Sequence, residues 1–436
     1  MRLHPEWKCT EPMNIENLAG DAVTLSPRRT LEHEFGENQL QTVPASEIAN
    51  RIVALQALLK KNGVDAAVVR QNADLFYFTG TVQDSHLVVP SSGNPIFLVR
   101  RSLERAEAES PLRPIIRMNS MAQLREAAFE ACGTGEPKII GLELDVLPAN
   151  TFFFYDEKIF PKQQIVDVSG LIRQTRMIKS SWEIGIMRDA AAISKLVAES
   201  VPRLLTAGMT EIELFAELEA VSHKAGSSGM LRLRAFNMEM VFGHILSGPN
   251  AAVPSYTNAP TGGPGVSPAF GQGAGTKKIA AGEIVSVDTG TISNGYTNDQ
   301  TRNFCIGPPP LRLADAYEFV KSVHARFREV ARPGAVTGEL YAIVWRWARE
   351  AGWAEWFMGC CEPKVSFVGH GIGIEFDEFP FVAEGQKLEL QEGMVFAFEP
   401  KVIIPDEGTA GLENTYLVTS SGIESLNTTT EELVII

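Results

Sequence analysis

The chain lacks any apolar run of about eighteen residues, the length that a membrane-spanning helix needs. It is also poor in positive charge, because 39 Lys and Arg stand against 53 Asp and Glu, a formal net charge of −14. Residues 1–20 lack the apolar core of a signal peptide. These absences argue against membrane insertion, secretion and general nucleic-acid binding.

Cysteine is scarce as well, and a disulfide framework would need paired cysteines at regular spacing. The five cysteines are odd in number and scattered: Cys9, Cys132, Cys305, Cys360 and Cys361. They indicate a reducing, cytoplasmic location, and the adjacent last two are interpreted as structural because no second cluster lies near them. No G-x-G-x-x-G follows a strand pattern in the first half, so dinucleotide binding has no support.

The length of 436 residues exceeds one typical core and predicts two domains. Residues 1–44 are polar without periodicity and are predicted to be an extension. Residues 45–172 alternate helix-like and strand-like segments, which predicts an α/β layer. The helix expected over 47–63 precedes the expected strands VDAAVV, DLFYFTGT, HLVVP and NPIFLVR.

Residues 173–436 begin with a long amphipathic helix, in which Ile184, Met187 and Ala191 recur on one face. A second helix is predicted to start with Thr210 as its N-cap. The run from 247 to 275 is rich in Gly, Pro and Ser, and loops of this length are typically functional. We expect it to form a rim for substrate.

Carboxylates also interrupt the strand-like segments IVSVDTG, GYTNDQTRNF, MVFAFEPK and AGLENTYLVT, and a histidine lies in FVGHGIG. Isolated buried charges are very costly unless they are paired or bind metal, and four carboxylates in one interior repel each other. Two divalent cations would cancel four negative charges, and one imidazole would complete the ligand shell. Each residue alone could be an ordinary turn, strand-end or loop residue. Together they predict a two-metal hydrolytic site at Asp288, Asp299, His370, Glu399 and Glu413.

These motifs together resemble the pita-bread metallopeptidases: methionine aminopeptidases, Xaa-Pro aminopeptidases and prolidases, with creatinase as a relative. The resemblance covers residues 45–436 and is nearest to the Xaa-Pro peptidase-like members. It implies an α/β (α+β) protein with a creatinase-type N-terminal α/β domain over 45–172. A pita-bread catalytic domain with a curved antiparallel sheet would follow over 173–436. Homodimers are the habit of this family.

By this likeness Asp299 and Glu413 bridge two ions, Asp288 chelates one of them, and His370 with Glu399 serve the other. Glu399 would double as general base and acid. Manganese or cobalt is the expected metal, although zinc and iron also suit such ligands. The expected substrate is a short peptide or small amide, and the expected reaction releases the N-terminal residue from Xaa-Pro-type peptides.

Three departures from the family pattern concern the substrate. The glycine-rich loop ahead of the first aspartate holds no histidine, and His244 either takes its place or packs in a strand. Asp377 stands where the family usually has a histidine in H-E-x-P, and Gly411 stands where prolidase-like members often have an arginine. These changes keep two alternatives open: a creatinase-like hydrolase of a small C–N compound, and a non-catalytic binding protein.

Arg302 lies three residues after Asp299 in an apolar strand pattern. We expect its guanidinium to orient the Asp299 carboxylate through a charge-assisted hydrogen bond. A surface ion pair is the alternative interpretation of this arginine.

Overall fold

The computed structural model describes residues 41–133 and 135–436. Most of the extension expected over 1–44 lies outside these described residues. Within them, Pro44 precedes the first helix, and the side chain of Val43 is buried.

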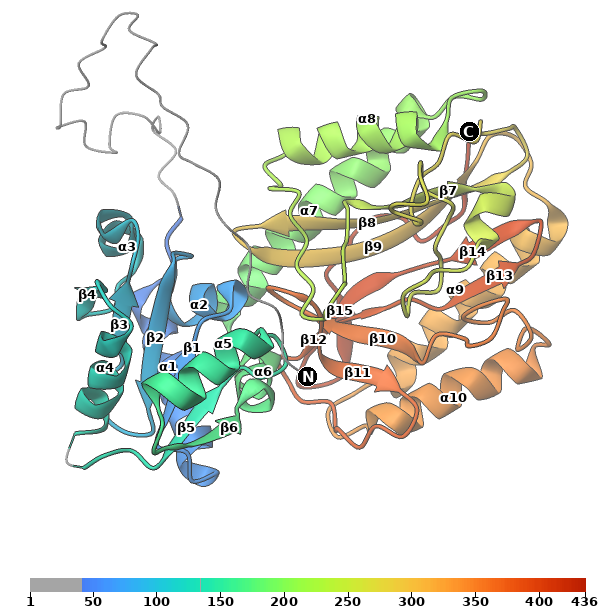
Figure 1. Ribbon diagram of the computed structural model, residues 1–436. Coiled ribbons are helices and arrows are strands. Elements are labelled where there is room, and N and C mark those ends of the chain that lie inside the picture. The colour runs from blue at the N-terminus through green and yellow to red at the C-terminus, as the bar shows by residue number, and fades with distance from the viewer. Residues whose placement is uncertain (1–40, 134) are drawn as a thin grey trace, which may run out of the picture. The chain divides into compact units, whose positions relative to one another are not determined.

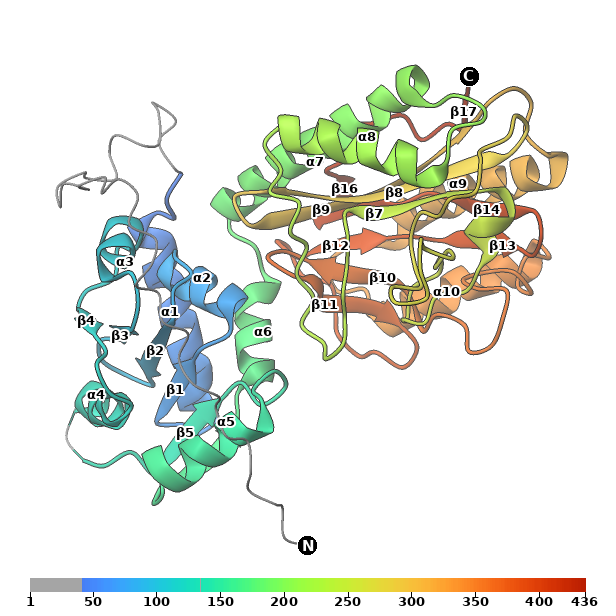
Figure 2. The same cartoon turned by 45° about the horizontal axis from the view of Figure 1, so that its top comes forward.

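The N-terminal elements build one six-stranded mixed sheet, with strand order β4-β3-β2-β1-β5-β6. The elements are α1 (Ala45–Lys61), β1 (Ala66–Val69), α2 (Asn72–Thr79), β2 (Ser85–Pro90), β3 (Ile96–Val99), α3 (Leu103–Glu109), β4 (Ile115–Arg117), α4 (Ala122–Cys132), β5 (Ile139–Leu142), α5 (Ala149–Phe154), β6 (Gln164–Asp167) and α6 (Ser169–Met177). Helices surround this sheet in both ribbon views (Figures 1 and 2). The α/β layer expected for this part of the chain is therefore confirmed.

One expected strand is wrong, because DLFYFTGT forms helix α2. The side chain of Gln71 accepts a hydrogen bond from the Asp74 backbone N–H at the start of the helix, and Gly80 ends it with φ of +79°. Nearly all of its side chains are buried, so no polar face marks the helical period in the sequence. A short apolar run of this kind cannot be assigned by periodicity alone.

The remaining elements build a layered domain in which strands pair mainly antiparallel. They are α7 (Ser181–Leu204), α8 (Glu211–Lys224), β7 (Gly243–Ser247), β8 (Ile284–Ser293), β9 (Tyr296–Cys305), α9 (Leu311–Val330), α10 (Thr337–Glu350), β10 (Phe367–Ile372), β11 (Phe376–Ala383), β12 (Val395–Phe398), β13 (Lys401–Ile404), β14 (Gly408–Gly411), β15 (Asn414–Val418), β16 (Ile423–Ser425) and β17 (Val434–Ile435). The sheet orders are β17-β9-β8-β7, β11-β10-β12-β15-β16 and β13-β14. Helices α7 and α8 cover the first sheet, and α9 and α10 pack on the other strands (Figure 2).

The two helices α7 and α8 begin with the same reciprocal arrangement. Ser180 and Thr210 each accept a hydrogen bond from the backbone of the glutamate three residues on, and that glutamate bonds back to the cap. Thr210 is thus confirmed as an N-cap. Met187 and Ala191 of α7 are buried, as their spacing predicts.

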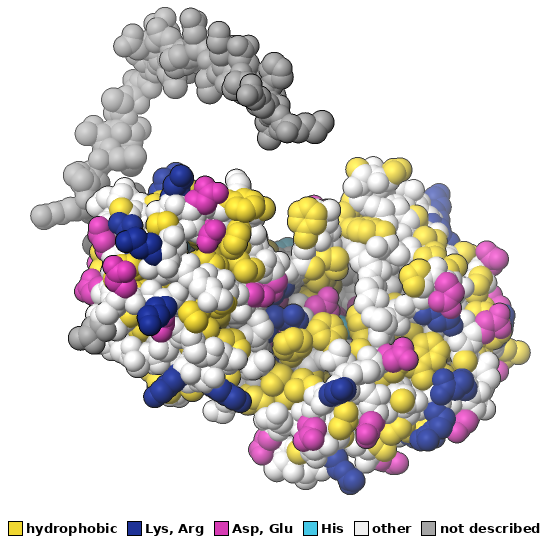
Figure 3. All heavy atoms as spheres, turned by 60° about the horizontal axis from the view of Figure 1, so that its bottom comes forward, with side chains coloured by type: hydrophobic (Ala, Val, Ile, Leu, Met, Phe, Trp, Pro, Cys, Tyr) yellow, Lys and Arg dark blue, Asp and Glu magenta, His cyan; other side chains and the backbone are white. Residues whose placement is uncertain are grey.

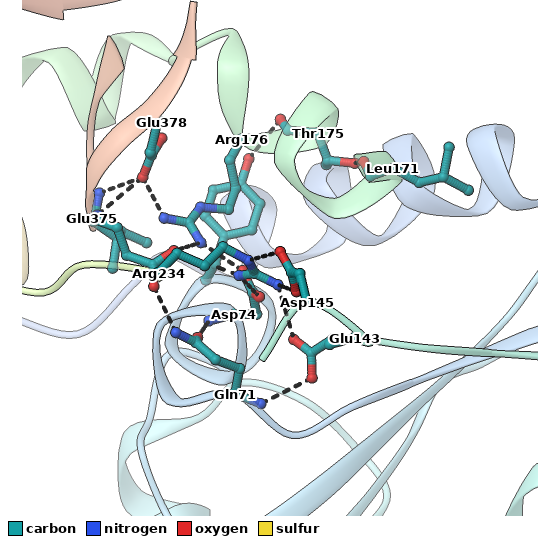
Figure 4. Close-up of polar contacts among 12 residues, drawn as sticks. Gln71, Asp74, Glu143, Asp145, Leu171, Thr175, Arg176, Arg234, Glu375 and Glu378 are labelled. Atoms are coloured by element: carbon teal, nitrogen blue, oxygen red, sulfur yellow. Dashed lines mark hydrogen bonds and ion pairs between the residues drawn. The ribbon is translucent and has the colours of Figure 1, made fainter. Parts of the chain in front are cut away.

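A buried ionic cluster joins the N-terminal elements to β11 (Figure 4). Arg176 of α6 pairs with Asp74 of α2 at 2.6 Å and with Glu375 at 2.7 Å, and it also contacts Glu378. Arg234 pairs with Asp74 as well. Removing one partner of such a buried pair leaves an uncompensated charge, which is strongly destabilising.

The cluster strongly shifts the pKa of the Glu378 carboxylate. Burial raises its pKa, but Arg176 and Lys179 outweigh that effect and lower the pKa from 4.5 to about 2. The backbone N–H groups of Ile374 and Glu375 donate hydrogen bonds to the same carboxylate oxygen.

Glu378→Gln should therefore lose stability that depends on pH. A pKa lowered on folding contributes stability above pH 4.5, and that stability is lost as the pH falls towards 2. A difference of this size corresponds to about 3 kcal/mol in the free energy of unfolding. Urea unfolding at a series of pH values should show a large difference in the free energy of unfolding between wild type and variant at pH 7. This difference should become smaller in acid. Glu318→Gln, which breaks an exposed pair with Lys321, should show a small gap throughout. A gap for Glu378→Gln that stays constant from neutral to acidic pH would contradict this account.

Candidate metal centre

The five residues expected to bind metal come together from five strands or strand ends. Asp288 lies in β8, Asp299 in β9 and His370 in β10. Glu399 directly follows β12, and Glu413 directly precedes β15. All five line one cavity.

The hairpin of β8 and β9 explains the spacing of the two aspartates. Asp288 pairs with Thr301, and Asp299 pairs with Gly290, so the aspartates lie two register positions apart. Side chains two residues apart point to the same face of a sheet. The hairpin therefore delivers both carboxylates to the same side.

The imidazole of His370 faces three of the carboxylates. Its Nε2 lies 3.7 Å from Asp299 Oδ2, 3.8 Å from Glu399 Oε1 and 3.9 Å from Glu413 Oε1. Ligand atoms of Asp299, His370 and Glu413 lie within 4.8 Å of one another. This is an arrangement of oxygens and one nitrogen around a common point.

Electrostatics at this point favour a cation. Burial raises the pKa of Asp299 well above its usual value, and the neighbouring carboxylates of Glu413, Asp288 and Glu399 raise it further. Asp299 Oδ1 and Glu413 Oε1 are buried without a hydrogen-bond partner among the described residues. Orphaned buried carboxylate oxygens beside an imidazole fit a divalent ion that prefers hard oxygen ligands.

A lysine that sequence analysis missed lies among the same carboxylates. Lys401 Nζ is 2.8 Å from Asp288 Oδ2, 2.8 Å from Glu399 Oε2 and 3.6 Å from Glu413 Oε2. Burial acts to lower the pKa of Lys401, but these three carboxylates raise it well above its usual value. Lys401 directly follows the motif FEP in an apolar strand, and a charged residue in such a strand was the signal available.

The cavity has a volume of about 720 Å³, including its open mouth. Besides the five residues, its walls are largely apolar and include Leu233, Met240, Pro260, Phe367 and Phe376. Thr257 and Thr261, from the run expected to form a substrate rim, also line it. The face drawn in Figure 3 is hollowed, with hydrophobic, acidic and basic side chains along the hollow.

His244 and Asp377, the two further candidates, also line this cavity. His244 pairs with Asp288 in the register of β7 and β8, and its Nδ1 lies 3.4 Å from Thr261 Oγ1. Burial lowers the pKa of His244, although the Asp288 carboxylate opposes this effect. Asp377 Oδ1 lies 3.4 Å from His370 Nδ1, on the ring nitrogen that does not face the carboxylates.

Arg302 does not orient Asp299, so that expectation is wrong. Its guanidinium is buried and donates to the backbone carbonyls of Thr301 and Glu413 and to the side chain of Asn414. Arg302, three residues after Asp299 in β9, lies beside the start of β15 and bonds to the chain there. Arg302 thus holds the backbone of Glu413 in place. The Thr301 hydroxyl donates a hydrogen bond to the Glu413 side chain, at Oε2, over 2.7 Å.

Comparison with known proteins agrees with this geometry. Residues 185–420 match metallopeptidase family M24, and residues 51–178 match the creatinase/prolidase N-terminal domain. The chain belongs to metallopeptidase family M24, and it is a metallopeptidase with a creatinase-type N-terminal domain. The family implies divalent metal ions, which the buried Asp, His and Glu group can hold.

Individual relatives match over nearly their whole length. The chain is 26% identical over 386 residues to the Xaa-Pro dipeptidase of Pyrococcus furiosus, covering 88% of this chain and 99% of that protein. The prolidase structure from Pyrococcus horikoshii is similar with a TM-score of 0.73 and 26% identity, over 88% of this chain and 99% of that one. The structure of dipeptidase PepE from Mycobacterium ulcerans gives a TM-score of 0.74 at 26% identity, over 91% and 100%. The predicted pita-bread architecture is thereby confirmed.

The helices and the cysteines can also be compared with what the sequence predicts. None of the helices in the described part of the chain has the length and apolar character needed to cross a membrane. Cys360 Sγ and Cys361 Sγ are 3.8 Å apart and are free thiols, as are Cys132 and Cys305.

Asp299→Asn should abolish tight metal binding, because it removes a charged ligand from the point that His370 faces. Isothermal titration with Mn²⁺ should show an affinity at least about 100-fold lower than that of wild type. Losing a residue that only supports a metal ligand costs up to about 100-fold, and losing a ligand itself should cost at least as much. Asp315→Asn is a matched control, since it makes the same chemical change on the exposed side of α9. Its Mn²⁺ affinity should equal that of wild type, and wild-type affinity in Asp299→Asn would contradict the site.

Proposed function

We propose that this chain is a metal-dependent aminopeptidase that releases the N-terminal residue from Xaa-Pro-type peptides. The observation that carries the proposal is the buried cluster of Asp299, His370 and Glu413 at the floor of an apolar cavity. Membership of family M24 supports it, as do relatives named Xaa-Pro dipeptidase and prolidase. The comparisons do not favour hydrolysis of a small C–N compound or a non-catalytic role.

The proposed metal ligands are those predicted from the sequence: Asp288, Asp299, His370, Glu399 and Glu413. Manganese or cobalt is the proposed metal, because four carboxylates and one imidazole make an oxygen-rich shell. When bound, a divalent ion supplies Lewis-acid chemistry and lowers the pKa of water. The proposed catalytic domain is 173–436, and 45–172 is its companion N-terminal domain.

The chain's own residues would handle the protons and orient the groups. Glu399 is the proposed general base and acid, because its carboxylate lies at the cavity floor beside His370. A neutral His244 can donate one hydrogen bond to a substrate carbonyl from the wall. Asp377 faces His370 Nδ1 and would hold the ring so that Nε2 points at the carboxylates.

The charge of the cavity favours an aminopeptidase over an enzyme restricted to dipeptides. Among the described residues that line it, acidic Glu239 and Asp377 supplement the cluster, and none is Lys or Arg. Gly411 likewise offers no side chain for a substrate carboxylate. Acidic walls suit the ammonium group of a peptide N-terminus, and the apolar walls suit a prolyl ring.

The test is a cleavage screen, read by mass spectrometry, with the Mn²⁺-loaded or Co²⁺-loaded protein. The substrates are an Xaa-Pro dipeptide, the same dipeptide as its C-terminal amide, a longer Xaa-Pro peptide and a matched Xaa-Ala peptide. We expect release of the N-terminal residue from the amide and the longer peptide at least as fast as from the free dipeptide. The Xaa-Ala peptide should be cut at least about tenfold more slowly.

Asp299→Asn is the inactive control for this screen and Asp315→Asn the active one. Asp299→Asn should lose at least about 100-fold in kcat/KM, while Asp315→Asn should retain wild-type turnover. Silence of the metal-loaded wild type on every peptide would contradict the proposal. Cleavage confined to free dipeptides would contradict the aminopeptidase assignment and leave a dipeptidase.

We further propose a cytoplasmic homodimer, the habit of the resembled family. Free thiols in the described residues support the location. Phe236 and Met230 support the assembly, because they are 89% and 67% exposed in the segment that leads to the cavity wall. Size-exclusion chromatography with light scattering should give twice the mass of 47.6 kDa, and a monomer at micromolar concentration would contradict the dimer.

A further inference from the structure

The carboxylate oxygens of the metal centre divide between two nitrogen-bearing side chains, His370 and Lys401. Glu399 turns Oε1 towards His370 Nε2 and Oε2 towards Lys401 Nζ. Glu413 does the same, with Oε1 near His370 Nε2 and Oε2 near Lys401 Nζ. Asp299 belongs to the histidine group and Asp288 to the lysine group. The second group therefore already has a cation at its centre, supplied by the chain.

The backbone holds Lys401 in this position. Its side chain is 1% exposed, and its carbonyl accepts a hydrogen bond from the Met358 N–H at 2.9 Å. Lys401 and Gly411 are direct partners in the pairing of β13 and β14. A Cβ at position 411 would lie 2.7 Å from Lys401 Cγ and 3.2 Å from its Cδ. The absence of a side chain at Gly411 thus leaves the space that the aliphatic part of the Lys401 side chain occupies.

The ammonium group and a second divalent ion would compete for the same place. Lys401 Nζ has oxygens of Asp288 and Glu399 within 2.8 Å and one of Glu413 at 3.6 Å. A divalent cation that used those oxygens would have to approach them to about 2.0–2.2 Å. It would then lie inside the volume of the ammonium group, with charge of the same sign. Asp299 Oδ1 and Glu413 Oε1 are buried with no hydrogen-bond partner in the described part of the chain, and Glu413 Oε1 faces His370 Nε2.

We propose that Lys401 takes the place of a second divalent cation, so that the centre binds one metal ion beside His370. That ion would be held by Asp299, His370, Glu399 and Glu413. Lys401 would neutralise Asp288 and the outer oxygens of Glu399 and Glu413. The inference deepens the proposed function and rests on its metal-dependent site. It replaces the two ions that the sequence pattern predicts with one, and it removes Asp288 from the proposed ligands.

The deciding measurement is the number and magnetic state of Mn²⁺ ions on the full-length wild type. Chelator-stripped protein is loaded with excess Mn²⁺ and desalted, then analysed by elemental mass spectrometry and electron paramagnetic resonance. We expect about one Mn²⁺ per chain with the hyperfine pattern of an isolated ion. About two per chain, with the spectrum of an exchange-coupled pair, would overturn the inference without reference to any variant.

Lys401→Ala tests whether the lysine itself excludes the second ion. Removing the ammonium and opening its volume should raise the content from about one to about two Mn²⁺ per chain and produce the coupled spectrum. Lys321→Ala, which removes a partly exposed lysine from α9, should keep the wild-type content. A folded Lys401→Ala protein, verified by circular dichroism, that still binds one ion would also overturn the inference.

Peptide cleavage measured on the same samples separates this inference from the proposed function. One ion per wild-type chain without cleavage of any peptide would contradict the function and support the role of Lys401. Two coupled ions with cleavage would contradict the role of Lys401 and support the function. Wild type that retains no Mn²⁺ would contradict both.

Discussion

The mutual repulsion of buried carboxylates is the constraint on which this structure depends. Four acidic side chains reach one point between paired strands, where the low dielectric strengthens every interaction between charges. The chain meets this constraint with an imidazole, a buried lysine and the capacity to hold a metal ion. The cluster around Arg176 obeys the same rule, because its arginines and Lys179 compensate Asp74, Glu375 and Glu378. In both clusters a buried cation pairs with a carboxylate from a distant part of the sequence, Arg176 with Asp74 and Lys401 with Asp288.

The sequence was informative wherever a pattern is local. The strands that carry Asp288 and Asp299, the Thr210 cap and the face of α7 could be predicted because local patterns along the chain determine them. Helix α2 could not, since its almost uniformly buried residues erase the helical period. The partners of Arg302 and Lys401 could not be predicted for another reason. Their partners are decided by which strands lie side by side, and no spacing along the chain encodes that neighbour relation.

Gly411 and Lys401 are explained together by their place in the sheet. By its sequence alone, Gly411 is interpreted as a lost arginine, and Lys401 after FEP carries a positive charge near it in the fold. The pairing of β13 with β14 places the two residues opposite each other. Gly411 has no side chain, and this leaves room for the side chain of Lys401. Positive charge at this sheet is retained, but it faces the carboxylates of the metal centre and leaves the apolar cavity without a basic wall residue.

The hairpin of β10 and β11 has a mechanical consequence. It carries His370 on one strand and Glu378 on the other, and Arg176 binds Glu378 from the N-terminal side. Swinging the N-terminal sheet away would separate the buried Arg176 from Glu375 and Glu378 and pull on the hairpin that carries the imidazole. We therefore expect access to the cavity to depend on local movement of its wall segments over 233–244 and 257–272, and not on separation of the two sheets.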